Sequence, residues 1–211
     1  MILVVAAHPD DEVLGCGGTI AQYAKQGKEV VSLIFSDGDP LNDSKKYITE
    51  RRKESINAGK VLGISQVLFL GLPDNPFGPD LKKDTTFKKV ENIIVKLKPK
   101  EIFTHCSDDP HPAHRSVAQL VQKVVKSNKL HAKVYAFKIG NPLKIKHRDS
   151  PRLYIDISKT MNLKRKAMKE FHSQKKYMWY YSILAIINNK IEGAHSGHKY
   201  AEVFHKESHE N

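Results

Sequence analysis

The chain has 211 residues, a mass of 23.9 kDa and a formal net charge of +12, a size that fits one ordinary domain over residues 1–211. Its 40% hydrophobic and 27% charged residues are typical of a soluble globular protein and exclude a disordered or fibrous chain. The apolar run over residues 2–7 meets His8 and Pro9 at once, which is too short for a signal peptide or a membrane span. We therefore expect a cytoplasmic protein whose two cysteines are reduced.

Strand and helix patterns alternate along the chain. Continuous apolar, β-branched runs predict strands at residues 2–6, 30–35, 67–70, 101–104, 134–137 and 153–157. Apolar residues at helical spacing predict helices at residues 12–26, 45–62, 86–97, 114–126 and 161–172, and a further apolar segment follows at 178–187. Buried strands joined by helices predict an α/β fold, a Rossmann-like, mostly parallel sheet with helices on both faces and a basic C-terminal extension.

The loops after the strands are the expected place for a ligand. In sheets of this kind, ligands bind beyond the carboxyl ends of the strands, where the strand order reverses. The loops that begin at residues 7, 36, 71 and 105 should therefore gather at one edge of the sheet.

The first of these loops reads His8-Pro9-Asp10-Asp11-Glu12. Three carboxylates and an imidazole within five residues repel or compete unless a cation or hydrogen bonds compensate their charge, so a bound metal is a natural explanation. The alternative is that Asp10 or Asp11 caps the following helix. Capping accounts for one aspartate and leaves the rest of the set unexplained.

The loop after the fourth strand supplies the complement. It carries His111 and His114 at an H-x-x-H spacing, beyond a strand that should lie beside the first. Together with His8 and Asp11, these side chains are the imidazole and carboxylate ligands expected of a catalytic zinc. Such a site uses three protein ligands and leaves a position for water.

These motifs resemble the PIG-L/LmbE-like family of zinc-dependent N-acetylglucosaminyl de-N-acetylases. The resemblance is carried first by residues 4–12 with the glycines that follow, and by the run His111-Pro112-Ala113-His114. It continues through further segments at residues 36–38, 51–63, 70–74, 164–174 and 200–204. It thus covers nearly the whole chain.

The resemblance implies a role for each matching residue. His8, Asp11 and His114 would bind zinc, with iron as the alternative metal. Asp10 would act as the general base, and His111 would polarise or stabilise the acetamide oxygen. Chemistry supports this division, because zinc lowers the pKa of its bound water toward about 7 and a nearby carboxylate can take the remaining proton.

Two substrate contacts are also implied. Arg51 matches the family's substrate-contacting arginine, and an ion pair with Glu54 on the same helix is the alternative. Asp74 corresponds to a carboxylate that grips sugar hydroxyls, and a simple turn residue beside Pro73 is the alternative.

The chain departs from the family pattern at Ala113, where an aspartate usually stands between the two histidines. The change removes a carboxylate that would orient His111 or raise its pKa. Asp108 or Asp109 could substitute for it.

The expected function is removal of the acetyl group from an N-acetylglucosamine-type amino sugar or its conjugate, with release of acetate. An amidase of the same family acting on another N-acyl group is the first alternative. The second is a basic binding module for nucleic acid or anions with a structural metal, because eight of the twelve net charges lie between Lys144 and Lys176. No nucleic-acid partner is expected, since no helix-turn-helix or RNA motif accompanies these charges. The aromatic segment at residues 178–181 suits a homo-oligomer contact.

Overall fold

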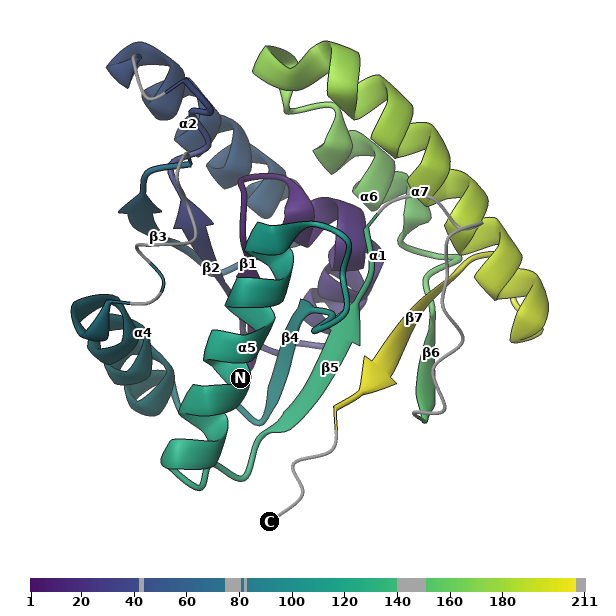
Figure 1. The fold of residues 1–211 in the computed structure, drawn as a ribbon. Helices are drawn as coiled ribbons and strands as arrows, with labels where there is room; N and C mark the ends of the chain where they lie inside the picture. The colour runs from purple at the N-terminus through teal and green to yellow at the C-terminus, as the bar shows by residue number, and fades with distance from the viewer. Residues whose placement is uncertain (42–43, 75–80, 82, 140–150, 208–211) are drawn as a thin grey trace.

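The computed structural model describes residues 1–41, 44–74, 81, 83–139 and 151–207. The strands within these residues are β1 Ile2–Ala6, β2 Val30–Ser36, β3 Gln66–Leu72, β4 Glu101–His105, β5 Lys133–Phe137, β6 Arg152–Asp156 and β7 Ala201–Lys206. They form one seven-stranded sheet in the order β3-β2-β1-β4-β5-β7-β6 (Figure 1). Strands β1 to β5 run parallel, whereas β7 is antiparallel to both of its neighbours.

Helices cover both faces of the sheet (Figure 1). They are α1 Asp11–Lys25, α2 Lys45–Leu62, α4 Asp84–Leu97, α5 Pro112–Ser127, α6 Met161–Met168 and α7 Lys175–His195. Alternate residues of β1 serve the two faces: Leu3 and Val5 join the apolar cluster under α4 and α5, and Ile2 and Val4 join the cluster under α1, α2, α6 and α7. The predicted α/β fold is confirmed.

The C-terminal part differs most from the pattern-based prediction. The helix expected over residues 161–172 ends at Met168, and a short 3-10 turn at His172–Gln174 precedes the long helix α7. Strand β7 was not predicted, because Glu202 and His205 interrupt its apolar run. Since β7 pairs with both β5 and β6, the basic C-terminal part is built into the same sheet.

The buried carboxylate of Glu202 in β7 joins this strand to both α1 and α6. The helix breaks at Cys16, where φ is −144° and ψ is 22°, and the backbone N–H groups of Gly18 and Thr19 donate to the Glu202 carboxylate at 3.0 and 2.7 Å. The fully buried Lys164 of α6 donates to the same carboxylate at 2.6 Å. Glu202 thus compensates the amides that the break leaves without helical partners.

The glycines of α1 allow it to lie close to its neighbours. A β-carbon on Gly15 would overlap the ring of Phe137, and one on Gly18 would lie 2.7 Å from the side chain of Ile157. Close packing of α1 therefore explains both glycines.

Candidate metal centre and active site

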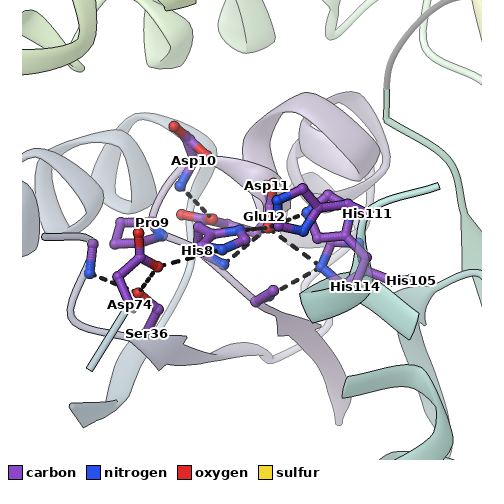
Figure 2. Close-up of polar contacts among 12 residues, drawn as sticks. His8, Pro9, Asp10, Asp11, Glu12, Ser36, Asp74, His105, His111 and His114 are labelled. Carbon is purple, nitrogen blue, oxygen red and sulfur yellow. Dashed lines mark hydrogen bonds and ion pairs between the residues drawn. The ribbon is translucent and has the colours of Figure 1, made fainter. Parts of the chain in front are cut away.

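The candidate site lies at the carboxyl ends of β1 and β4, neighbouring strands between which the chain reverses its direction of travel across the sheet. Strand β1 leads to His8 and Asp11, and β4 ends at His105 and leads to His114 (Figure 2). Strand β3 leads to Asp74, which accepts a hydrogen bond from the last residue of β2. The four loops expected at this edge of the sheet do meet there.

The three predicted metal ligands converge on one point. The potential ligand atoms of His8, Asp11 and His114 all lie within 4.8 Å of one another. Oδ2 of Asp11 is 3.1 Å from Nδ1 of His8 and 3.3 Å from Nε2 of His114. Two imidazoles and one carboxylate are a donor set that suits a divalent transition metal.

A second carboxylate stands behind each of the two histidines. Nε2 of His8 lies 3.4 Å from Asp74, and Nδ1 of His114 lies 3.1 Å from Asp109. Metal-binding histidines characteristically present their second ring nitrogen to a carboxylate, which fixes the ring's orientation and raises its basicity. This arrangement of ligand and supporting carboxylate fits a bound metal.

Burial and the neighbouring charged groups together set the pKa values of His114 and Asp11. Burial by itself would lower the pKa of His114, but Asp11 and Asp109 outweigh burial and raise this pKa to about 10. Burial would likewise raise the pKa of Asp11, but His114 and His105 hold it well below its ordinary value. A metal that binds here must displace the proton that His114 shares with these carboxylates.

His105 is a fourth histidine at the site, and it differs in its bonding. Its Nε2 accepts a hydrogen bond of 2.9 Å from the backbone N–H of Ala7 and lies 3.4 Å from Oδ2 of Asp11. Burial, with His114 nearby, lowers the pKa of His105 to about 4. The neutral ring stacks on His114 at 4.0 Å between centroids and joins the ends of β1 and β4.

Asp10 holds an unusual backbone conformation beside the ligands. Its φ of 125° lies in a region that L-residues rarely adopt, and such strain of about 1–3 kcal/mol is characteristic of functional sites. Its backbone N–H donates to the Glu12 carboxylate at 3.1 Å. Asp10 occupies the cap position of α1 without a side-chain capping bond, so the capping interpretation does not explain it.

The surroundings of Asp10 suit a proton acceptor. Burial raises the pKa of Asp10 to about 6, although the Arg51 guanidinium opposes that shift. Burial, followed by the nearby Asp10 carboxylate, raises the pKa of Glu12 to about 8. A carboxylate that titrates near neutral pH is well matched to general-base catalysis.

Arg51 lies against the loop that carries the candidate ligands His8 and Asp11. It is 3% exposed, and its Nη2 donates to the carbonyl oxygen of Pro9 at 2.5 Å and to Oδ2 of Asp10 at 3.3 Å. The alternative partner, Glu54, instead accepts hydrogen bonds from the backbone and hydroxyl of Ser173. The proposed substrate contact of Arg51 stays a prediction, and the structure adds a role in holding the loop.

His111 sits at the start of α5 among the other histidines. Its ring centroid is 5.1 Å from that of His8 and 4.6 Å from that of His114. Burial, and then the two neighbouring imidazoles, lower the pKa of His111. The side chain of Ala113 packs in the apolar core, and Asp109 accepts the backbone N–H of His111 at 2.8 Å.

Sequence reasoning passed over His105 and Asp109 as site residues, although both stand in the histidine-rich loop that it singled out. Asp109 was considered as a support for His111, whereas its carboxylate lies against the ring of His114. A carboxylate two residues before one histidine and five before another can support either ring. Only the path of the chain into α5 decides between them.

Fold and site together define an α/β protein with a candidate metal centre at the carboxyl edge of its sheet. The family model of PIG-L, described as GlcNAc-PI de-N-acetylase, matches residues 3–125. The chain therefore belongs to the PIG-L family, and the resemblance seen in the sequence is confirmed. The candidate metal ligands His8, Asp11 and His114 all lie within the matched residues.

Several named proteins are similar to this chain in sequence. The uncharacterized deacetylase YaiS of Escherichia coli is 32% identical over 123 residues, which are 56% of this chain and 64% of the relative. Diacetylchitobiose deacetylase of Thermococcus kodakarensis is 26% identical over 95% of this chain and 80% of its own. The 4-oxalmesaconate hydratase of Pseudomonas putida is 28% identical over 87% of this chain and 78% of its own.

The fold agrees with solved structures. The N,N'-diacetylchitobiose deacetylase of Pyrococcus horikoshii superposes with a TM-score of 0.80, covering 98% of this chain and 83% of the other at 23% identity. Among the described residues, no helix combines the length and apolar character needed to cross a membrane.

Proposed function

We propose that this chain is a zinc-dependent N-deacetylase that hydrolyses the acetamide of an N-acetylglucosamine-type sugar or its conjugate and releases acetate. The observation that carries the proposal is the convergence of His8, Asp11 and His114 beside the strained, buried Asp10. Family membership and the named deacetylases among the relatives support it. Residues 1–211 would form one catalytic domain.

The proposed reaction joins one water molecule to the amide and breaks its C–N bond. Zinc held by the three ligands would polarise the water and the amide carbonyl. Asp10 takes a proton from the attacking water and returns it to the leaving amine nitrogen. His111, kept neutral by its lowered pKa, donates its ring N–H to the acetamide oxygen as negative charge develops there.

Arg51 and Asp74 are proposed to bind the sugar from the opposite side of the loop. Two nitrogens of Arg51, Nε and Nη1, are buried without a hydrogen-bond partner within the described residues, so the guanidinium retains donors for a substrate hydroxyl. Asp74 accepts the Ser36 hydroxyl at 2.5 Å and faces His8. Asp74 would therefore combine ligand support with sugar recognition.

The experiment that tests the proposal measures metal content and acetate release on the same preparations. Wild-type protein should hold about one zinc per chain after reconstitution and release acetate from N-acetylglucosamine conjugates. The His8→Ala/His114→Ala variant should lose both properties, and Asp10→Asn should keep the metal while losing turnover. The exposed His131→Ala variant is the matched control and should retain both.

Three results would contradict the proposal. Absence of bound metal after zinc reconstitution would remove the basis of the mechanism. Equal turnover of simple N-acetyl amines and of N-acetylglucosamine conjugates would replace the sugar substrate with a general N-acyl substrate. Binding of DNA or RNA that weakens steeply with salt, without any hydrolysis, would favour the basic binding module.

A second candidate function is hydration of an unsaturated carboxylic acid. The relative that favours it is the 4-oxalmesaconate hydratase, because its similarity extends over 87% of this chain. Addition of water to a double bond needs a proton acceptor of the kind that Asp10 provides, followed by protonation of carbon rather than of nitrogen. Loss of the enoate absorbance in the presence of the zinc-loaded protein, without acetate release from any amide, would select this function.

A further inference from the structure

A buried hydroxyl group lies between the two loops that carry His8 and Asp74. Ser36, the last residue of β2, is 0% exposed, and its backbone N–H donates to the carbonyl oxygen of Ala7 at 2.8 Å. On its other side, Ser36 pairs in register with Leu72 of β3. Because the chain runs on from these two neighbours into the loops of His8 and Asp74, the sheet itself places Ser36 between them.

The hydroxyl of Ser36 makes two hydrogen bonds of opposite direction. Its oxygen accepts the backbone N–H of Gly38 at 2.8 Å, and a backbone N–H can only donate. The hydroxyl itself donates to Oδ1 of Asp74 at 2.5 Å (Figure 2). The same oxygen of Asp74 lies 3.4 Å from Nε2 of His8. Ser36 thus holds in place the carboxylate oxygen that faces the histidine ring.

This carboxylate oxygen determines which nitrogen of His8 is left for a metal. A hydrogen-bond acceptor favours the proton on the ring nitrogen that faces it, which here is Nε2. Nδ1 then keeps its lone pair and lies 3.1 Å from Oδ2 of Asp11. His114 has the opposite arrangement, because its Nδ1 faces Asp109 and its Nε2 lies 3.3 Å from the same Oδ2. The two histidines therefore turn different nitrogens toward one point.

We propose that Ser36 is a positioning residue of the candidate metal centre, which acts through Asp74 to present Nδ1 of His8 to the metal. Ser36 is out of solvent and both hydrogen bonds of its hydroxyl stay within the protein, so it acts through another residue rather than on the substrate. The inference rests on the proposed function only for the presence of zinc.

A purely local role for this hydroxyl would be to stabilise the turn after β2. Gly38 has a φ of 78°, and a β-carbon there would lie 2.9 Å from Pro9, so the turn is closely packed. The hydrogen bond from the Gly38 N–H would by itself serve that turn. Asp74, in contrast, is 38 residues away along the chain and has no part in the turn. The two roles differ measurably, because only the positioning role depends on Asp74.

The test measures the zinc affinity of the metal-free protein by competition with a chromogenic chelator, with zinc alone as the probe. Ser36→Ala should weaken zinc binding by about tenfold, because loss of a group that orients a metal-binding histidine typically costs about 10- to 100-fold. Ser36→Thr keeps the hydroxyl and should bind zinc nearly as tightly as wild type. Ser36→Cys fills similar space with a weak donor and should resemble Ser36→Ala.

Ser32→Ala is the matched control. Ser32 lies on the same strand and is also 0% exposed, and its hydroxyl has no hydrogen-bond partner among the described residues. Its substitution should leave the zinc affinity unchanged. The melting temperature of each metal-free variant separates a loss of folding from a loss of zinc binding.

A double-mutant cycle shows whether Ser36 acts through Asp74. Asp74→Asn should weaken zinc binding by itself. Ser36→Ala/Asp74→Asn should bind zinc no more weakly than Asp74→Asn, because the hydroxyl then has no carboxylate left to orient. A long-range proton–nitrogen NMR spectrum of the zinc-loaded protein adds a direct signature. It should show His8 bound through Nδ1 and protonated at Nε2, and His114 the reverse.

Three results would overturn the inference. An unchanged zinc affinity in Ser36→Ala would show that the hydroxyl does not support the centre. If the losses of the two single variants multiply in the double variant, Ser36 acts independently of Asp74. Zinc bound through Nε2 of His8 would show that Asp74 does not select the nitrogen.

The zinc measurements also separate this inference from the proposed function. If zinc binding weakens as expected in Ser36→Ala but the wild type releases acetate from no N-acetyl substrate, the inference stands and the proposed function is wrong. If the wild type releases acetate and the variants bind zinc equally well, the proposed function stands and the inference is wrong. Absence of zinc binding by the wild type would overturn both.

Discussion

The parallel and antiparallel parts of the sheet hold their buried charges in different ways. In the parallel part, β1 and β4 deliver His8, Asp11 and His114 to one point at which a metal would complete the charge balance. In the antiparallel part, Lys164 and Glu202 neutralise each other directly, at 2.6 Å and fully out of solvent. The side chains of the first group remain free to bind a metal and take part in a reaction. The two charges of the second group are neutralised by each other and stabilise the fold.

The comparison teaches that reactivity and stability are located in different parts of one domain. The candidate ligands come from residues 8–114, on loops whose positions are set by the parallel strands. The C-terminal part clamps α1 through Glu202 and contacts α2 through Ser173. Substitution of the candidate ligands or of Asp10 should therefore alter chemistry with little effect on folding, and substitution of Lys164 or Glu202 should do the reverse.

Substitution of the proposed base should have the largest effect on chemistry. Asp10→Asn should lower the kcat of acetate release by about 10²–10⁴, because an amide cannot accept the proton of the attacking water. The melting temperature should stay near that of wild type, since the amide oxygen can still accept from Arg51. The exposed Asp84→Asn variant on α4 is the matched control. An unchanged kcat in Asp10→Asn would show that Asp10 is not the general base.

Breaking the buried ion pair should have the largest effect on stability. Lys164→Met should reduce the free energy of unfolding by about 3–5 kcal/mol, because it leaves the Glu202 carboxylate buried without its counterion. Urea denaturation followed by circular dichroism measures this change. The exposed Lys166→Met on the same helix should change stability by no more than about 0.5 kcal/mol. If both variants lose a similarly small free energy of unfolding, the Lys164–Glu202 ion pair does not stabilise the fold.

The carboxylate behind His114 should have an intermediate effect. Asp109→Asn should weaken metal binding by about 10- to 100-fold, because the second ring nitrogen loses the charge that orients it. Competition with a chromogenic chelator measures the affinity, and Asp84→Asn again serves as control. If Asp109→Asn binds metal as tightly as wild type, Asp109 does not support the ligand.

The smallest expected effect lies in the antiparallel part and concerns pH. Hydrogen bonds from the hydroxyl and backbone of Ser158 lower the pKa of Asp156. A carboxylate with a lowered folded-state pKa adds stability above its unfolded pKa, and this stability is lost as the pH falls through the folded value. Ser158→Ala should move the Asp156 pKa upward in an NMR titration. A pKa that does not move would show that the hydroxyl contributes nothing.

Much of the parallel part was predictable because its information is local. Continuous apolar runs predicted β1 and β2 to within a residue at their ends, and helical spacing of apolar residues predicted α2 over Lys45–Leu62. The motifs that predicted His8, Asp11 and His114 lie within two short loops. Parallel strand ends meet at one edge of a sheet, so two local patterns sufficed to predict a common site.

The tertiary structure alone decided how these loops are supported. Ala7 and His105, which share a hydrogen bond, are 98 residues apart, and Gly18 and Glu202 are separated by 184. Glu202 interrupts the apolar run of β7, so the hydrophobic pattern did not predict this strand. Glu202 is nevertheless buried, because it accepts hydrogen bonds at the break in α1 and from Lys164. Hydrophobic periodicity records which side chains leave water, whereas the partner of a buried charge is set by the path of the whole chain.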